Sequence, residues 1–260
     1  MASDTPHIEV EDLTMAYGSF VIMKNLCISI RRGEVFIIMG GSGCGKSTLL
    51  RHLVGLKDPS NGRILFDGVD FTNANEETRQ EILRRFGVLF QSGALWSSMT
   101  LAENISLPIA EFTDLPDREI REIVSYKLSL VGLRGFEEFY PSEISGGMCK
   151  RAGLARAMAL DPEILFFDEP SAGLDPISSR RLDDLILQLR DNLGTTIVVV
   201  THELQSIFAI ADNSVFLDSH SRTMKAMGNP HELLKHSHDP DLIQFLTRGQ
   251  KSPTQSNQAA

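Results

Sequence analysis

Residues 40–47, GGSGCGKS, have the types and spacing of a loop that binds phosphate groups. They stand between an apolar segment and a segment with helical spacing, so backbone N–H groups and a helix dipole can surround phosphate oxygens. Lys46 can reach the β- and γ-phosphates of a nucleotide, and the Ser47 hydroxyl can ligate Mg²⁺. Because the dinucleotide pattern GxGxxG is not met, the loop disfavours a Rossmann-type oxidoreductase.

Three other apolar segments end in polar residues that suit phosphate hydrolysis. One ends at Asp168, which can hold the Mg²⁺ shell, and at Glu169, which can polarise a water for attack on the γ-phosphorus. Another precedes His202, which can donate to the γ-phosphate side, and a third ends at Gln91, which can touch metal and attacking water. Ligands of open α/β sheets bind at the carboxyl ends of strands, so these side chains are expected to converge.

A second turn that could face phosphate lies about a hundred residues after the first. Ser145 can cap the helical run that follows it, and Gly146 and Gly147 let a ligand approach the backbone closely. The free N–H groups of such a helix start form an anion site. The first loop already provides a phosphate site, so the second turn requires a separate explanation.

The elements that must position these residues alternate between apolar strands and amphipathic helices. Strands are expected at 8–17, 21–30, 34–39, 63–66, 86–90, 164–167, 196–200 and 215–217. Helices are expected at 46–53, at 116–131 before Gly132, and around Leu182, Leu185, Ile186 and Leu189 before Gly194. Buried strands alternating with helices predict a mostly parallel sheet. The mainly helical stretch from about 92 to 159 is then an insertion in an α/β core.

These motifs, in this order, resemble the nucleotide-binding subunit of ABC transporters from about residue 8 to 230. The resemblance implies an α/β fold, with a P-loop ABC ATPase core of mostly parallel sheet, an antiparallel β subdomain and an inserted helical subdomain. It implies ATP hydrolysis with Mg²⁺, with Glu169, His202 and Gln91 as catalytic residues and Ser47, Gln91 and Asp168 at the metal. It assigns ATP binding to Tyr17, whose ring would stack on adenine, and to Gly40, Gly41, Ser42, Gly43, Cys44, Gly45, Lys46, Ser47 and Thr48.

The resemblance also explains the second turn. In such cassettes two copies pair head to tail, and the signature of one copy faces the ATP held by the other. The signature residues here are Ser145, Gly146, Gly147 and Met148, and the D-loop is Ser171, Ala172, Gly173, Leu174 and Asp175. The implied organisation is a single ABC ATPase domain over 1–245, with core segments 1–91 and 156–230, a helical signature subdomain at 92–155, C-terminal helices at 230–247 and a disordered tail at 248–260.

Within the family, the sequence resembles the ATPase subunits of the Mce/Mla type. Met148 replaces the usual Gln of the signature, and the segments FQSGALW and DPDLIQFL also look like that group. The resemblance implies a motor for phospholipid traffic between the inner and outer bacterial membranes, placed on the cytoplasmic face of the inner membrane. Its implied partners are a second copy, a multi-spanning permease, a periplasmic Mce-domain lipid-binding protein and a small STAS-domain protein.

Composition narrows the alternatives. The net charge of −9 argues against a nucleic-acid binder, and three scattered cysteines indicate reduced thiols. No signal peptide and no membrane-spanning run is expected. A soluble ABC scaffold of the iron–sulphur assembly type and another small importer or exporter remain open. A chromosome or DNA-repair ATPase would show long coiled coils, and a tandem translation factor would need two phosphate loops.

Three local features have more than one interpretation. Leu95, Trp96, Met99 and Leu101 either fill the core of the helical lobe or line a groove for a permease helix. The segment HELLKH at 231–236 nearly matches a zinc motif, but its histidines would point about 140° apart, which favours a plain surface helix. Cys44 fits as a small residue in the phosphate loop, where a thiol reagent is expected to block ATP binding.

Overall fold

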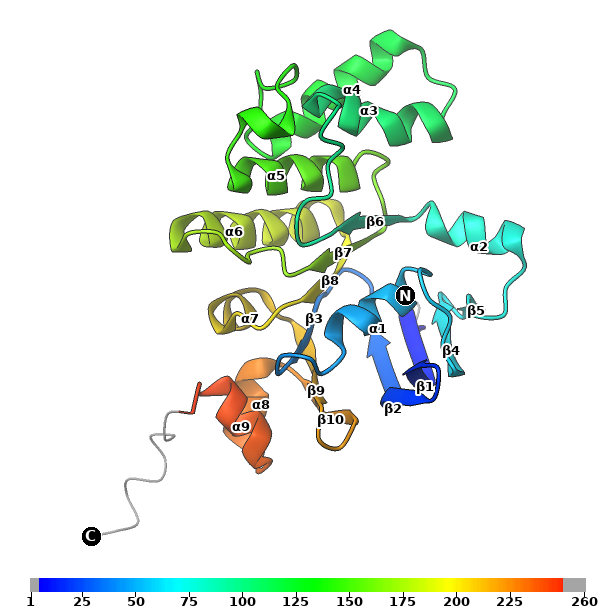
Figure 1. Cartoon of the computed structure of the whole chain (residues 1–260), viewed down its shortest axis with the longest axis vertical. Helices are drawn as coiled ribbons and strands as arrows, with labels where there is room; N and C mark the ends of the chain where they lie inside the picture. The colour runs from blue at the N-terminus through cyan, green and yellow to red at the C-terminus, as the bar shows by residue number, and fades with distance from the viewer. Residues whose placement is uncertain (1–4, 250–260) are drawn as a thin grey trace.

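The computed structural model describes residues 5–249 and is built around a six-stranded sheet in the order β10-β9-β3-β8-β7-β6 (Figure 1). Its strands are β3 (Val35–Gly40), β6 (Phe86–Leu89), β7 (Ile164–Asp168), β8 (Thr196–Val200), β9 (Asn213–Asp218) and β10 (Thr223–Gly228). All neighbouring pairs are parallel except β10 and β9. The predicted mostly parallel sheet is therefore confirmed.

The central strands are apolar on both faces because both faces are covered. In β3, Phe36 and Ile38 pack into a cluster with α1 (Lys46–Leu53) and the second sheet. Their neighbours Ile37 and Met39 pack into the cluster formed with the helices on the opposite face. Side chains alternate across a strand, so one continuous apolar run supplies two layers of core.

The second sheet is antiparallel and has the order β2-β1-β4-β5. Its strands are β1 (Ile8–Tyr17), β2 (Phe20–Ile30), β4 (Asn61–Phe66) and β5 (Val69–Asp70). A turn at Gly18 and Ser19 joins β1 to β2, and Gly18 has a left-handed φ of 57°. The strand expected at 63–66 is part of β4, which forms a hairpin with β5.

The helical lobe follows β6 in the chain and lies above it in Figure 1. It consists of α3 (Leu101–Phe112), α4 (Asp117–Leu130), the 3-10 turn Pro141–Glu143 and α5 (Gly146–Ala157). Thr100 and Glu103 form a capping box that starts α3. The predicted apolar face of α4 packs into the same core cluster as Ile37 and Met39, so the lobe and the sheet share one core.

The remaining helices flank the sheet and reach its lower end in Figure 1. They are α2 (Glu76–Leu83), α6 (Pro176–Leu193), α7 (Leu204–Ile210), α8 (Pro230–His236) and α9 (Pro240–Leu246). Asn229 caps α8 and Asp239 caps α9, whose Leu242 and Leu246 are buried. Among residues 5–249, no helix is long and apolar enough to cross a bilayer.

Three elements were not predicted from the sequence, namely α2, the seven-residue α7 and β10. In α2 only Ile82 is buried, so no apolar stripe marks the helix. The edge strand β10 is half-buried along most of its length and lacks an apolar run. Helix α5 ends at Ala157, inside the mainly helical stretch expected from about 92 to 159. Most of the tail expected to be disordered, residues 250–260, lies outside the described residues.

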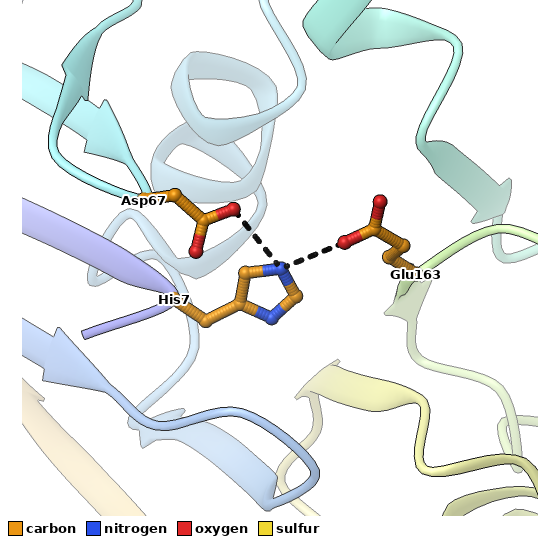
Figure 2. A group of neighbouring side chains, drawn as sticks. All are labelled: His7, Asp67 and Glu163. Atoms are coloured by element: carbon orange, nitrogen blue, oxygen red, sulfur yellow. Dashed lines mark ion pairs between the residues drawn. The ribbon is translucent and has the colours of Figure 1, made fainter. Parts of the chain in front are cut away.

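A buried histidine joins the two sheets (Figure 2). His7 precedes β1, and its Nδ1 lies 2.7 Å from Oγ1 of Thr196 in the central sheet. Its Nε2 lies 3.9 Å from an Asp67 oxygen and 3.6 Å from a Glu163 oxygen. Arg32 and Arg85 each pair with both carboxylates. With both acids already matched by guanidinium groups, this cluster is an ion-pair network rather than a metal centre.

Candidate active site

The phosphate loop joins β3 to α1 and depends on glycine at its two ends. At Gly40, a Cβ atom would lie 2.4 Å from the carbonyl oxygen of Leu217 in β9, so no side chain fits. Gly45 precedes α1 with a left-handed φ of 97°. The loop therefore turns tightly against the sheet and points the start of α1 at the ligand space, as a phosphate site requires.

Lys46 lies inside this loop and is only 8% exposed. Its Nζ donates to the carbonyl oxygens of Gly40 and Gly41, each at 3.0 Å. The ammonium group is therefore fixed where the loop surrounds its ligand. This position agrees with the predicted contact to the β- and γ-phosphates.

Ser47 and Asp168 bring the start of α1 to the end of β7. Ser47 Oγ donates to Asp168 Oδ1 at 2.9 Å. A hydroxyl and a carboxylate at this separation are the oxygen donors that Mg²⁺ prefers. The pair was expected from sequence, although the residues stand far apart in the chain.

Glu169 and His202 bring the ends of β7 and β8 together. His202 Nδ1 lies 2.8 Å from Glu169 Oε1. Glu169 is 8% exposed and has a left-handed φ of 49°, which is uncommon for a residue with a side chain. Its Oε2 is buried and has no hydrogen-bond partner within residues 5–249. An orphaned carboxylate oxygen at a strand end is suited to accept a proton from a water or ligand.

A cleft of about 850 Å³ gathers these groups. It is lined by the predicted residues Gly40, Gly41, Ser42, Gly43, Gly45, Lys46, Ser47, Thr48, Gln91, Glu169 and His202. Seven residues not expected from sequence also line it: Phe20, Ile22, Leu204, Gln244, Phe245, Arg248 and Gly249. Four of these seven come from α9 and the residues after it, and an Arg248–Glu203 ion pair at 3.6 Å connects that segment to the strand end beside His202.

Two of the expected ATP ligands lie away from the cleft wall. Tyr17 is half-exposed, and Lys57 Nζ lies 3.3 Å from the centroid of its ring. Phe20, at the other end of the β1–β2 turn, lines the cleft instead. Stacking of adenine on Tyr17 therefore stays a prediction, and it requires Lys57 to leave one face of the ring.

Cys44 is part of the phosphate loop, but its side chain points into the core and is only 1% exposed. Its side chain belongs to the core cluster with α1, and burial raises the pKa of the thiol. Because reaction needs an accessible thiolate, the structure argues against the expectation that a thiol reagent modifies Cys44 and blocks ATP binding. The contribution of Cys44 to a nucleotide would come from its backbone.

The signature turn does not reach the cleft of its own chain. Ser145 Oγ accepts from Met148 N at 3.3 Å and so caps α5. Ser145 and Gly147 line a separate pocket of about 340 Å³, and none of its lining residues lines the cleft. Met148 packs its half-buried side chain against the core of the lobe. In Figure 1, α5 and α1 lie on opposite sides of the central sheet.

The expected D-loop, residues 171–175, connects the end of β7 to this second pocket, which Leu174 lines. Ser171 is buried, and its Oγ has no partner in the described part of the chain. The Leu174 side chain lies close to Gly147 of the signature turn: a Cβ atom added to Gly147 would be 3.5 Å from it. Asp175 caps α6 by accepting from Ile177 N and Ser178 N, each at 3.0 Å. The cap gives Asp175 a structural role at the start of α6.

The histidines of the 231–236 segment have separate partners. His231 Nε2 lies 3.0 Å from the carbonyl oxygen of Phe208, and His236 Nε2 lies 3.2 Å from Glu232. In residues 5–249, the one group of His, Cys, Asp and Glu side chains with metal-ligand spacing is the His7 network of Figure 2.

Comparisons with known proteins show which family the chain belongs to. The family model described as ABC transporter matches residues 23–172. The intermembrane phospholipid transport system ATP-binding protein MlaF of Haemophilus influenzae is 44% identical over 92% of this chain and 89% of that protein. The probable ribonucleotide transport ATP-binding protein mkl of Mycobacterium leprae is 45% identical over 92% of this chain and 68% of that protein.

Solved structures of similar fold are nucleotide-binding cassettes. CbiO1 from Clostridium perfringens, part of the ABC transporter complex cbiONQ, superposes with a TM-score of 0.81 and 30% identity, over 90% of this chain and 92% of that one. The ATP-binding cassette MJ0796, a dimer bound to ADP and Pi, superposes with a TM-score of 0.77 and 27% identity, over 85% of this chain and 98% of that one.

The fold and the cleft define a P-loop nucleoside triphosphatase of the cassette type. The chain belongs to the ABC transporter family. The cassette fold and ATP hydrolysis coupled to transport, both expected from the sequence, are confirmed by these comparisons.

Proposed function

We propose that this chain is the ATP-hydrolysing motor of a bacterial phospholipid transporter and that it works as a head-to-tail pair. The observation that carries the catalytic part is the cleft, in which the phosphate loop, Gln91, Glu169 and His202 face one space. The lipid part rests on the sequence similarity to the MlaF proteins, because the residues that contact a transported molecule belong to other chains.

The side chains of the cleft divide the chemistry among them. Lys46 and the loop amides hold the phosphates, and Glu169 Oε2 accepts a proton from the attacking water. His202 fixes Oε1 of the same carboxylate at 2.8 Å, which leaves Oε2 free for the water. Gln91, exposed on the cleft wall, orients water and metal ligands.

The residues at the start of α1 and the end of β7 fit a magnesium ion. Ser47, Asp168 and Gln91 would supply a hydroxyl, a carboxylate and an amide oxygen. When bound, Mg²⁺ would neutralise charge on the β- and γ-phosphates. The 2.9 Å bond between Ser47 and Asp168 aligns two of these donors before any ligand arrives.

Pairing of two copies accounts for the separation between the signature turn and the cleft. Within one chain these sites have no lining residue in common. Head-to-tail pairing would close each cleft with the Ser145–Gly147 turn of the other copy, so that ATP holds the pair together. The dimeric state of the similar cassette MJ0796 supports this arrangement.

A groove beside the helical lobe is the proposed docking site for the permease. It has a volume of about 540 Å³ and is bordered by Trp96, Leu107 and Phe112, which are 57%, 42% and 49% exposed. Leu101, in contrast, is fully buried and fills the core of the lobe. Of the four residues considered from sequence, Trp96 therefore fits the docking interpretation and Leu101 the core interpretation.

The relatives' names disagree on the transported molecule, since one group is named for phospholipids and the other for ribonucleotides. We favour phospholipid because the chain spans 89% of the Haemophilus influenzae protein and 68% of the Mycobacterium leprae one. The further proposed partners are the multi-spanning permease, a periplasmic Mce-domain protein and a small STAS-domain protein. The proposed location is the cytoplasmic face of the inner membrane.

Purification of the tagged chain from membranes tests this proposal against a soluble scaffold. We expect a multi-spanning permease to co-purify, and the complex to move fluorescent phospholipid between vesicles only with hydrolysable ATP. Transport of a labelled ribonucleotide instead would favour the second substrate class. Recovery of the chain without any membrane protein would overturn the transporter function.

A further inference from the structure

Lys150 of helix α5 holds the segment that carries the catalytic carboxylate. Its side chain is 8% exposed, and its Nζ donates to the carbonyl oxygens of Pro170 at 2.9 Å, Glu169 at 3.5 Å and Ala172. All three acceptors lie in the turn between β7 and α6. One ammonium group near the start of α5 is thus hydrogen-bonded to the backbone of residues 169–172.

This contact does more than fill space. A buried ammonium is costly unless its three protons are satisfied, and here three backbone carbonyls satisfy them. The turn it holds contains Glu169 at a φ of 49°, a conformation that residues with side chains rarely adopt. Charge-assisted hydrogen bonds to the turn therefore stabilise an unusual backbone at the residue whose placement hydrolysis requires.

We propose that Lys150 is a positioning residue that couples the signature turn Ser145–Gly147 to Glu169 of the same chain. Lys150 lies on the same helix as that turn, and it lines the same pocket as Ser145 and Gly147. A partner's ATP that binds the turn shifts α5, and Lys150 passes the shift to residues 169–172. Occupancy of one cleft thereby sets the catalytic geometry of the other. This inference rests on the proposed pairing.

The test replaces the ammonium and keeps the aliphatic stem, with Lys150→Met. At saturating Mg-ATP, we expect kcat to fall about tenfold or more and KM for ATP to change by less than about twofold, because ground-state binding is untouched. Amide hydrogen exchange of the peptide 168–176 should accelerate without nucleotide. Lys150→Arg, which keeps a cation with several donors, should recover part of the rate.

Lys127→Met is the matched control, because it also removes a buried ammonium from the helical lobe. Lys127 is 2% exposed and pairs with Asp161, away from the D-loop. We expect it to lower the melting temperature while sparing kcat and exchange in 168–176. If Lys150→Met fails to fold, Lys150→Gln replaces it with the same measurements. Equal kcat and exchange in the Lys150 and Lys127 variants would overturn the inference.

Failure of the role proposed for Lys150 can be told apart from failure of the proposed ATPase chemistry. If Glu169→Gln turns over ATP at the wild-type rate, Glu169 is not the base and the proposed chemistry fails. If Glu169→Gln stalls while Lys150→Met matches the Lys127 control, only the coupling role of Lys150 fails.

Discussion

The imidazole Nδ1 of His202 lies 2.8 Å from Oε1 of Glu169, which joins the ends of two neighbouring parallel strands. The contact leaves one carboxylate oxygen held and the other, Oε2, without a partner among the described residues. A general base needs such a division, because a fixed carboxylate with one free oxygen presents a defined acceptor to water.

The first prediction follows from that free oxygen. Glu169→Gln should lower kcat by about a hundredfold or more, since an amide cannot accept the proton. ATP binding should persist, because Lys46 and the loop amides are unchanged, and the variant should accumulate as an ATP-bound dimer. Gel filtration with and without ATP, alongside phosphate release, measures both. Monomers at saturating ATP would contradict the pairing.

The second prediction separates two aromatic residues at the same turn. If adenine stacks on Tyr17, Tyr17→Ala should raise KM for ATP about tenfold, as expected from the loss of one base–aromatic stack. Phe20→Ala is the paired variant, because Phe20 lines the cleft and is also largely exposed. A larger effect at Phe20 than at Tyr17 would transfer the adenine contact to Phe20.

The third prediction concerns the signature. Met148→Gln should leave ATPase activity within about twofold of wild type, because the cap uses the Met148 backbone N–H and not its side chain. Steady-state hydrolysis by the folded variant is the measurement. A collapse of activity with an unchanged melting temperature would mean that the Met148 side chain acts at the interface.

The fourth prediction uses pH. Burial is the main cause that lowers the pKa of His7 to about 4, from an ordinary value of 6.5. Between those values the unfolded chain binds the proton and the folded chain does not, so the free energy of unfolding falls as pH drops from 6.5 to 4. The full loss is about 3 kcal/mol. Urea unfolding across this range should show that wild type loses stability relative to His7→Gln as the pH falls.

A second buried group, Asp183, also changes the free energy of unfolding in this pH range, so wild type has to be compared with His7→Gln. Burial raises the pKa of Asp183 to about 6, so its protonation in the folded state adds stability as pH falls through the same range. The opposite signs partly cancel in the wild type, whereas the difference between wild type and His7→Gln isolates His7. A difference that does not vary with pH would contradict the buried neutral imidazole.

The fifth prediction concerns the groove. Trp96→Ala should reduce co-purification of the permease several-fold, because a large exposed apolar side chain is a typical interface anchor. Tyr126→Ala is the matched control, since Tyr126 on α4 is also 57% exposed and lies outside the groove. Cysteines at Ser97 or Ser98, both exposed, should crosslink to a permease loop. Equal recovery in both alanine variants would argue against docking at Trp96.

Most of the residues that line the cleft were expected from the sequence because local patterns encode them. The phosphate loop, Glu169 and His202 each stand at a strand end, and parallel strands bring those ends to one edge. Arg248 and Gln244 could not be found this way, since only the packing of α9 brings them to the cleft. The role of Lys150 could not be found from the sequence either, because its carbonyl partners lie about twenty residues further along the chain.

Helix boundaries, too, could be predicted only where a local sequence signal marks them. Residues 46–53 and Gly194 were predicted correctly, because a loop motif or a C-terminal glycine marks them. Helix α2 has a capping signal, Asn75 accepting from Thr78 N, but it buries too little to be seen from hydrophobic periodicity. A start signal without an apolar stripe is not enough to predict a helix.

The two bonds from Lys46 to the carbonyls of Gly40 and Gly41 bear on affinity rather than on rate. They fix the shape of the loop through contacts within the chain, so nucleotide does not have to order a disordered segment on arrival. Binding becomes an exchange, in which phosphate oxygens replace loop carbonyls around one ammonium group. When product leaves, the same two carbonyls are in place to accept from the ammonium group again.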